Sequence, residues 1–350
     1  MSFVGKHINR LKKSINKRYS PEGTTYRILK NADYIEQLIV NLPEKDASVT
    51  YWKKAYLTYF HAHIEHYRKG KYLPKFILRN LYPKIGWYDF VKDNSNCIKD
   101  GILNLNGIYF PVPDHKDFGE DGFGSIIIDV LLQHLLQFTL EDIKNMDYKF
   151  YLVCPEGPYE YNNVFLNEGD IVIDAGACIG DFSALASYKK CTSYAFEALS
   201  FVQEKYLSKT MEMNKGIILA PYALSDKKKE IEFVFHTEEI GSSFISDIGR
   251  NAGQKKKEFI YEKVQAIDLD SFVNQENLEK VDFIKADIEG AERDMLKGAQ
   301  SVLKEFSPKL ALCTYHLPDD PEVMKELILQ ANPKYIIEQE FAKLYAYVPK

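Results

Sequence analysis

Residues 171–181 read Ile-Val-Ile-Asp-Ala-Gly-Ala-Cys-Ile-Gly-Asp, and this stretch decides the fold. Its apolar run is typical of a short strand buried on both faces of a sheet. Gly176, Ala177 and Gly180 then let the backbone come close to a ligand or a neighbouring helix. Asp174 lies where the strand ends, and ligands bind at the carboxyl end of such a strand when a helix follows it. By itself, the Asp-x-Gly-x-x-x-Gly pattern also fits a plain strand-to-helix turn.

The sequence around this stretch predicts an α/β fold. A second strand, 193–197, ends at Glu197, about 20 residues further on, where a carboxylate would accept hydrogen bonds from ribose hydroxyls. Strands and helices then alternate, which is the mark of a parallel sheet covered by helices. The predicted strands are 171–176, 192–197, 217–222, 281–287 and 309–315, and the predicted helices are 181–189, 200–214, 290–305 and 320–331. Tyr335–Phe341 and Leu344–Val348 follow as an antiparallel pair, so we expect a seven-stranded, mostly parallel sheet with one antiparallel edge strand.

Composition places the chain among globular proteins. It has 350 residues, of which 45% are hydrophobic and 27% charged, so it can bury a substantial core. A net charge of -5 argues against general nucleic-acid binding. The five cysteines are scattered and odd in number, which favours reduced thiols over a disulfide framework. No apolar run has the length of a membrane span and no signal peptide is evident, so we expect a cytoplasmic protein.

The periodicity and composition of the sequence divide the chain into two parts. Residues 1–98 form a helical, aromatic-rich N-terminal extension, and 99–350 form the main domain, whose core begins near residue 165. Before the core, the sequence predicts a hairpin, two helices and two strands; an insertion with two strands of its own follows the third core strand. These elements are Ile102–Val112 with Asn106-Gly107 at its turn, Asp121–Phe138, Leu140–Met146, Phe150–Val153, Glu160–Leu166, Ile231–Phe235 and Phe259–Ala266.

The first 20 residues carry six basic side chains and no acidic one, with apolar residues at helical spacing. This pattern predicts a basic amphipathic helix. One interpretation is peripheral contact with an anionic membrane surface. The other, which we favour, is a helix docked on its own domain with its charges in water.

Several blocks of the sequence resemble one known family. The blocks are Asp174-Ala-Gly-Ala-Cys-Ile-Gly-Asp-Phe-Ser183, Phe196-Glu197, Ala223-Leu-Ser-Asp226, Phe283-Ile-Lys-Ala-Asp-Ile-Glu-Gly-Ala-Glu292, Leu296-Lys-Gly-Ala299 and Leu312-Cys-Thr-Tyr-His316. In this order and at these intervals they are similar to the FkbM family of S-adenosylmethionine-dependent methyltransferases. The resemblance runs from about Ile102 to the C-terminus and leaves the first 95 residues outside. It implies a Rossmann-like class I methyltransferase fold.

The resemblance also implies roles for individual residues. Asp174, Gly176, Ala177 and Gly180 would line the methionine end of S-adenosylmethionine, and Glu197 would bind its ribose. Residues Ala223 to Asp226 would lie near the adenine, and Asp287 would face the sulfonium and the incoming nucleophile. The chain has Cys178 where the family usually has Asn, so a side-chain hydrogen bond to the cofactor loop is in doubt.

Methyl transfer to oxygen requires alignment of donor and acceptor and removal of a proton from the hydroxyl. We predict His316 as the general base, because a neutral imidazole near pH 7 accepts such a proton; the alternative is a histidine bonded to a carboxylate or to backbone. Glu289 or Glu292, near the start of a predicted helix, would serve equally well as a cap. A grouping of Asp287, Glu289 and Asp319 is compatible with a divalent metal, but nothing in the spacing requires one, so no metal ligand is assigned.

The sequence therefore predicts an O-methyltransferase that acts on a hydroxyl of a sugar, a glycan precursor or a related metabolite. The alternatives are an N-methyltransferase acting on an amino sugar and a catalytically silent binding module in a glycan-assembly complex. The expected partner is a small-molecule or glycan substrate, with no nucleic acid. The sequence indicates neither the acceptor nor the oligomeric state.

Overall fold

The described part of the chain covers the core domain. In a computed structural model, it comprises residues 98–105, 107–112, 117, 158–235, 244–245, 260–317, 319–340 and 342–349. The helix expected in residues 1–20 and nearly all of the extension 1–98 lie outside these residues, as do the elements expected at 121–138, 140–146 and 150–153. None of the helices in the described part has the length and apolar character needed to cross a bilayer.

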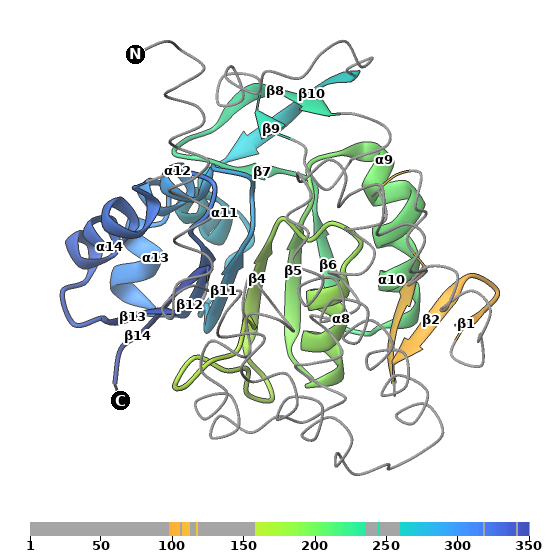
Figure 1. The fold of residues 1–350 in the computed structure, drawn as a ribbon, viewed down its shortest axis with the longest axis horizontal. Coiled ribbons are helices and arrows are strands. Elements are labelled where there is room, and N and C mark those ends of the chain that lie inside the picture. Colours follow the sequence, from red (N-terminus) through yellow and green to blue (C-terminus); the bar gives the residue numbers. More distant parts are fainter. Residues whose placement is uncertain are drawn as a thin grey trace, which may run out of the picture.

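A seven-stranded sheet forms the centre of the fold, in the order β13-β14-β12-β11-β4-β5-β6 (Figure 1). β4 pairs in parallel with both β5 and β11, and β14 runs antiparallel to its neighbours β12 and β13. This confirms the predicted mixed sheet; the reversed strand lies one place in from the edge, because β13 pairs with its outer side. The strands are β4 (Ile171–Ala175), β5 (Thr192–Phe196), β6 (Ile217–Ala220), β11 (Phe283–Ala286), β12 (Lys309–Cys313), β13 (Ile336–Glu340) and β14 (Lys343–Tyr347).

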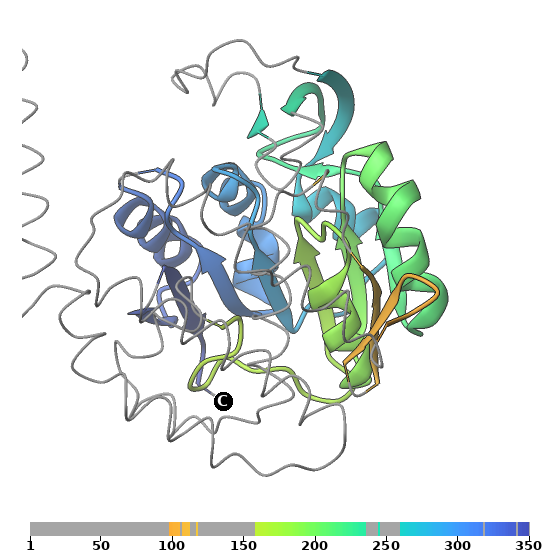
Figure 2. The same ribbon diagram turned by 45° about the vertical axis from the view of Figure 1, so that its right-hand side comes forward.

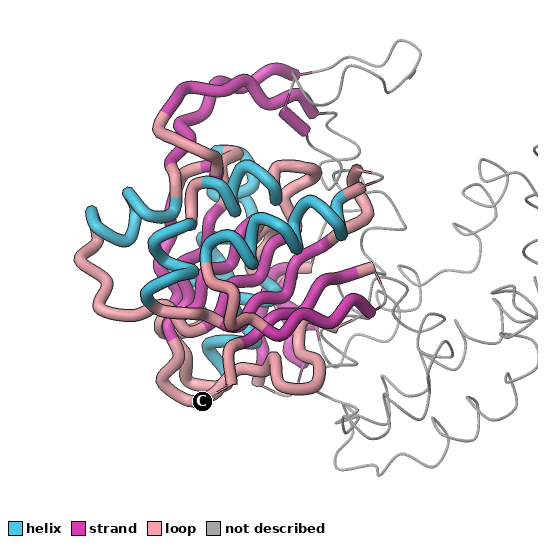
Figure 3. Tube along the Cα trace, turned by 90° about the vertical axis from the view of Figure 1, so that its left-hand side faces the viewer, coloured by secondary structure: helices cyan, strands magenta, loops and turns pink. Residues whose placement is uncertain are grey.

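Helices cover both faces of this sheet, as the tube view shows (Figure 3). Successive strand residues point to opposite faces. In β5, Phe196 packs in the larger core cluster with Phe272 of α11, whereas Ala195 packs in a smaller cluster with Leu207. The helical elements are α8 (Asp181–Tyr188), α9 (Ser200–Val202), the π-helix η5 (Gln203–Leu207), α10 (Ser208–Met213), α11 (Leu269–Gln275), α12 (Glu292–Lys297), α13 (Gln300–Glu305) and α14 (Asp320–Ala331).

Two predicted elements differ in the structure. The helix expected at 290–305 is broken into α12 and α13 at Gly298, where an added Cβ would lie 2.2 Å from the carbonyl oxygen of Ser225. The strand expected at Glu160–Leu166 is instead a tight turn, with one antiparallel bridge between Tyr161 and Val164. In both places a contact with another part of the chain, or a local turn, overrides the apolar periodicity.

Two smaller sheets flank the centre (Figure 2). β2 (Ile102–Leu105) and β3 (Ile108–Pro111) form the predicted hairpin, to which β1 (Ile98–Lys99) adds a third strand, and β3 packs beside α8 and α10. The insertion forms a sheet in the order β7-β10-β8-β9, which stands above the carboxyl ends of the central strands in Figure 1. Its strands are β7 (Ala223–Leu224), β8 (Lys229–Phe235), β9 (Phe244–Ile245) and β10 (Ile260–Ile267), so the two predicted strands of the insertion are confirmed.

Candidate active site

The turn after β4 adopts left-handed backbone at Gly176 (φ 72°), Cys178 (φ 52°) and Gly180 (φ 86°). The backbone N–H groups of Gly176 and Ala177 both donate to the carbonyl oxygen of Phe196, at 3.1 and 2.9 Å. A Cβ on Gly180 would lie 2.7 Å from a methyl group of Leu207, so this glycine permits close packing of the start of α8. The turn is thereby held over the carboxyl end of β5.

Gly176 also brings two strand ends into direct contact. A Cβ at this position would lie 2.0 Å from the carbonyl oxygen of Asp287, the residue that follows β11. The N–H of Asp287 donates to the carbonyl oxygen of Ala175 at 3.2 Å. The glycine turn and Asp287, which the sequence predicts to serve one site, are therefore neighbours.

Asp174 is fully buried beneath the turn. One carboxylate oxygen accepts a hydrogen bond from the hydroxyl of Ser183 at 2.6 Å, and the other pairs with Lys285 at 3.0 Å. The ammonium group of Lys285 also donates to the carbonyl oxygen of Gly176 at 2.7 Å. Asp174 therefore supports the turn from below, through the lysine.

Lys285 itself was missed by the sequence analysis. It lies in β11, which is otherwise apolar, and only 5% of it is exposed. Burial lowers the pKa of its ammonium group, but the carboxylates of Asp174 and Asp287 outweigh burial and hold that pKa above its ordinary value. The sequence did contain a signal for this role, because a lysine interrupts the otherwise apolar strand Phe283–Ala286.

Glu197 lies beside the glycine turn, as predicted for the residue that binds ribose. Its two carboxylate oxygens accept hydrogen bonds from the N–H groups of Cys178 (3.0 Å) and Leu199 (2.9 Å). Each oxygen keeps acceptor capacity for a further donor, such as a hydroxyl. Burial raises the pKa of this carboxyl to about 7.

The residues predicted to lie near adenine are in the insertion sheet. Ala223 is buried in β7 and packs in a cluster against which Ala198, the neighbour of Glu197, also packs. Asp226 pairs with Lys229 at 2.7 Å and accepts a hydrogen bond from Ser225 at 3.1 Å, and the hydrogen bond from Lys229 lowers the pKa of its carboxyl. Ala223 thus lies close to the end of β5, which Glu197 follows. The carboxylate of Asp226 is instead paired with Lys229.

Asp287 accepts hydrogen bonds from two phenols. The hydroxyl groups of Tyr159 and Tyr315 each donate to one of its carboxylate oxygens, both at 3.0 Å. Burial raises the pKa of this carboxyl. The positive charges of Lys285 and Lys343 outweigh burial, so the pKa of Asp287 lies below its ordinary value and the group is ionised at neutral pH.

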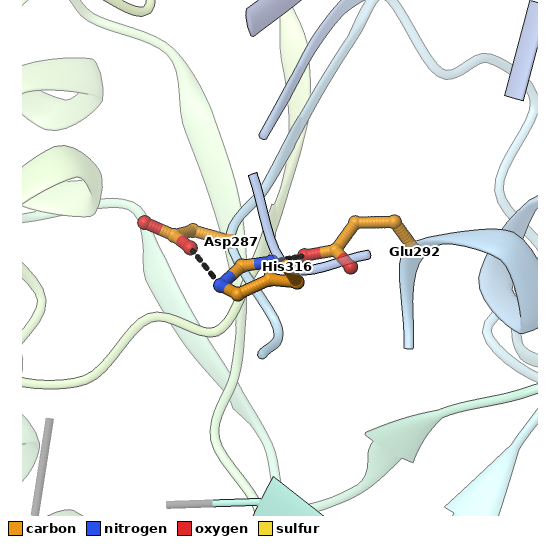
Figure 4. Close-up of side chains that lie close together, drawn as sticks. All are labelled: Asp287, Glu292 and His316. Atoms are coloured by element: carbon orange, nitrogen blue, oxygen red, sulfur yellow. Dashed lines mark ion pairs between the residues drawn. The ribbon is translucent and has the colours of Figure 1, made fainter. Parts of the chain in front are cut away.

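His316 lies between carboxylates, with its ring between Asp287 and Glu292 (Figure 4). Nε2 is 3.7 Å from Asp287 and 3.4 Å from Glu289, and Nδ1 is 3.1 Å from Glu292. Burial lowers the pKa of the imidazole, but Glu289 and Glu292 outweigh burial and raise it to about 10. The surrounding carboxylates therefore favour the imidazolium in the ligand-free protein, and the role of His316 as general base stays a prediction.

The remaining acidic residues have separate roles. Glu292 accepts hydrogen bonds from the N–H groups of Ile288 (2.9 Å) and Gly290 (3.0 Å), which is the predicted capping alternative. Asp319 pairs with Arg293 at 2.6 Å and is largely exposed, so it is committed to that arginine instead of joining Asp287. The same arginine pairs with the buried Asp320, which anchors the segment that carries His316.

The fold and the site together define a class of protein. The strand order, with one reversed strand at the hairpin edge and an acid-rich glycine turn after the central strand, is that of a Rossmann-like class I methyltransferase. Residues 174–345 match the model of the methyltransferase FkbM domain. Residues 174–345 of the chain therefore carry a methyltransferase FkbM domain.

Solved structures similar to this chain include several methyltransferases. Methyltransferase FkbM from Methylobacillus flagellatus is 19% identical, with a TM-score of 0.40, and the match covers 67% of this chain and 62% of that chain. Precorrin-6y C5,15-methyltransferase from Geobacter metallireducens is 11% identical, with a TM-score of 0.30, over 52% of this chain and 79% of that one. This chain thus spans 62% of the length of the FkbM structure that it matches. Among curated proteins, no sequence matches it.

Proposed function

We propose that this chain transfers the methyl group of S-adenosylmethionine to a hydroxyl oxygen of a sugar, a glycan precursor or a related metabolite. The observation that carries the proposal is the contact between Gly176 and Asp287. It sets an ionised carboxylate, already hydrogen-bonded by hydroxyl groups, directly beside the turn that the family uses for the cofactor. The sugar class of the acceptor is supported by the family resemblance.

The residues present fit the cofactor by their chemistry. Glu197 offers carboxylate oxygens to the ribose hydroxyls, and its backbone hydrogen bonds fix their direction. Asp181, at the start of α8, and Asp287, directly after β11, add carboxylates beyond the carboxyl ends of two adjacent parallel strands, suited to the positive charges of a sulfonium and an amino group. When bound, S-adenosylmethionine supplies a methyl group activated by its sulfonium.

Asp287 is the group that we assign to the acceptor hydroxyl. Tyr315 is 43% exposed, so its hydroxyl occupies a position on Asp287 that an acceptor hydroxyl can reach. An ionised carboxylate there accepts the hydroxyl proton in a hydrogen bond and turns the oxygen lone pair toward the cofactor side. His316, as an imidazolium, helps to keep Asp287 ionised.

One observation favours an amine acceptor as the second candidate. Glu289 and Asp287 place two carboxylates next to His316, an arrangement that also attracts a protonated amino sugar. The amine must lose its proton before it attacks, and the same carboxylates would receive that proton.

The test is methyl transfer from isotope-labelled S-adenosylmethionine into sugar and glycan extracts, with the product identified by mass spectrometry. Wild type should label an acceptor oxygen, whereas Asp287→Asn should lose transfer by about 100-fold or more and weaken cofactor binding in calorimetry by a much smaller factor. A label on nitrogen would select the second candidate. Absence of cofactor binding by wild type would refute both and favour a silent binding module.

A further inference from the structure

The ring of His316 is buried without a hydrogen bond. Its side chain is 8% exposed, and neither ring nitrogen makes a hydrogen bond, although carboxylates lie close to both. Such a buried, unsatisfied group ordinarily has a partner. Carboxylates at ion-pair distance from a ring nitrogen, but out of line for N–H donation, also fit a bound cation, which would displace the proton that the imidazole carries in its absence.

The distances around Nε2 suit a metal ion. Glu289 lies 3.4 Å and Asp287 3.7 Å from this nitrogen. Two ligands of one octahedral ion, each about 2.1 Å from the metal, are about 3 Å apart when adjacent and about 4.2 Å apart when opposite. Both distances fall within that range.

The two ring nitrogens have different surroundings. Figure 4 shows Asp287 and Glu292 on opposite sides of the ring, so a single ion cannot use both nitrogens. Both oxygens of Glu292 already accept backbone N–H groups, which fixes this carboxylate beside Nδ1. A carboxylate next to the second nitrogen is the usual outer partner of a metal-binding histidine.

The charges around the ring also favour a cation. Three carboxylates, those of Asp287, Glu289 and Glu292, surround one imidazole. Lys285 and Lys343 also act on Asp287, but Lys285 is paired with the buried Asp174. A negative field of this kind attracts a divalent cation, because the interaction scales with the charge of the ion.

We propose that Nε2 of His316 and the carboxylates of Asp287 and Glu289 bind a divalent cation of the Mg²⁺ and Mn²⁺ class, with Glu292 holding the ring through Nδ1. This site goes beyond the transfer reaction and does not require it. If the proposed function also holds, the ion lies on the acceptor side of Asp287, where it would bind the acceptor hydroxyl and lower the pKa of that hydroxyl.

The experiment measures Mn²⁺ binding to the full chain by calorimetry, with electron paramagnetic resonance reporting free Mn²⁺. Wild type should bind one ion, and His316→Gln and Glu289→Gln should each weaken binding by about tenfold or more. Glu289 is a partly exposed loop residue, so its variant tests the site even if the histidine variant fails to fold. Asp319→Asn is the matched control, because Asp319 lies three residues after His316 but its carboxylate pairs with Arg293. This variant should bind Mn²⁺ as wild type does.

Two results would overturn the site: no Mn²⁺ binding by wild type, or equal binding by wild type and Glu289→Gln. The ring would then be an imidazolium that bridges carboxylates. S-adenosylmethionine binding, measured in the same samples, separates this outcome from failure of the proposed function. If wild type binds S-adenosylmethionine but not Mn²⁺, only the metal site is refuted. If wild type binds Mn²⁺ but not S-adenosylmethionine, only the proposed transferase function is refuted.

Discussion

Replacing Gly176 with alanine tests the contact on which the site depends. The left-handed backbone at this position (φ 72°) costs an alanine about 1–2 kcal/mol. The new Cβ would also lie 2.0 Å from the carbonyl oxygen of Asp287. Real Cβ contacts of this kind are at least 3.0 Å, so the two strand ends must separate by the difference, 3.0 minus 2.0, or 1.0 Å. Overpacking of that kind costs about 1–3 kcal/mol, so the total destabilisation is about 2–5 kcal/mol.

Gly169→Ala is the matched control for this prediction. Gly169 also has left-handed backbone (φ 84°), but an added Cβ there meets nothing within 4 Å. Gly169→Ala should therefore lower the free energy of unfolding only by the cost of the left-handed backbone, about 1–2 kcal/mol. Urea unfolding compares the two variants, and methyl transfer should fall about 100-fold in Gly176→Ala alone, since a misplacement of about 1 Å has that effect. Equal destabilisation by the two substitutions would refute the reasoning, because the contact would then carry no cost.

Three further substitutions test the surroundings of the turn. The pKa of Glu197 in the folded protein, about 7, lies above its ordinary value of 4.5, so its contribution to stability is complete below pH 4.5 and is lost as the pH rises through 7. Wild type should lose up to about 1.4 kcal/mol per pH unit in that window relative to Glu197→Gln, measured by urea unfolding; parallel pH profiles would contradict this. Cys178→Asn should raise the melting temperature, because asparagine adopts left-handed backbone more readily than cysteine; Cys178→Ser, the control, should not. Lys285→Met should cost about 3–5 kcal/mol by leaving Asp174 buried without its counter-charge, and adding Asp174→Asn should restore part of the loss; no recovery in the double variant would argue against the pair.

The sheet and the position of the site were predictable because both follow from local rules. Alternating strands and helices fix a parallel sheet, and the carboxyl ends of parallel strands meet at one edge. The glycine turn, Glu197 and Asp287 follow β4, β5 and β11, which are adjacent in the sheet. Their proximity is therefore a consequence of strand order, which the alternation and the family resemblance both indicate.

The partners of the site residues could not be predicted in the same way. Tyr159 reaches Asp287 from 128 positions away, out of a segment to which the sequence assigned no helix or strand. Lys285 occupies a strand position that apolar patterning assigns to the core. The charge state of His316 depends on Glu289 and Glu292, whose approach to the ring is set by tertiary packing. A pattern along one segment carries no information on contacts of this kind.

The position of Asp287 is set by contacts on several sides. Lys285 supports the glycine turn below it, Tyr159 holds one of its oxygens, and the Arg293–Asp320 pair anchors the segment that brings His316 to the other oxygen. The backbone of Asp287 meets Gly176 without room for a methyl group, so this residue cannot shift without moving the turn. A substitution in any of these supports should therefore alter turnover more than cofactor affinity, since alignment of donor and acceptor is lost before the binding groups themselves are removed.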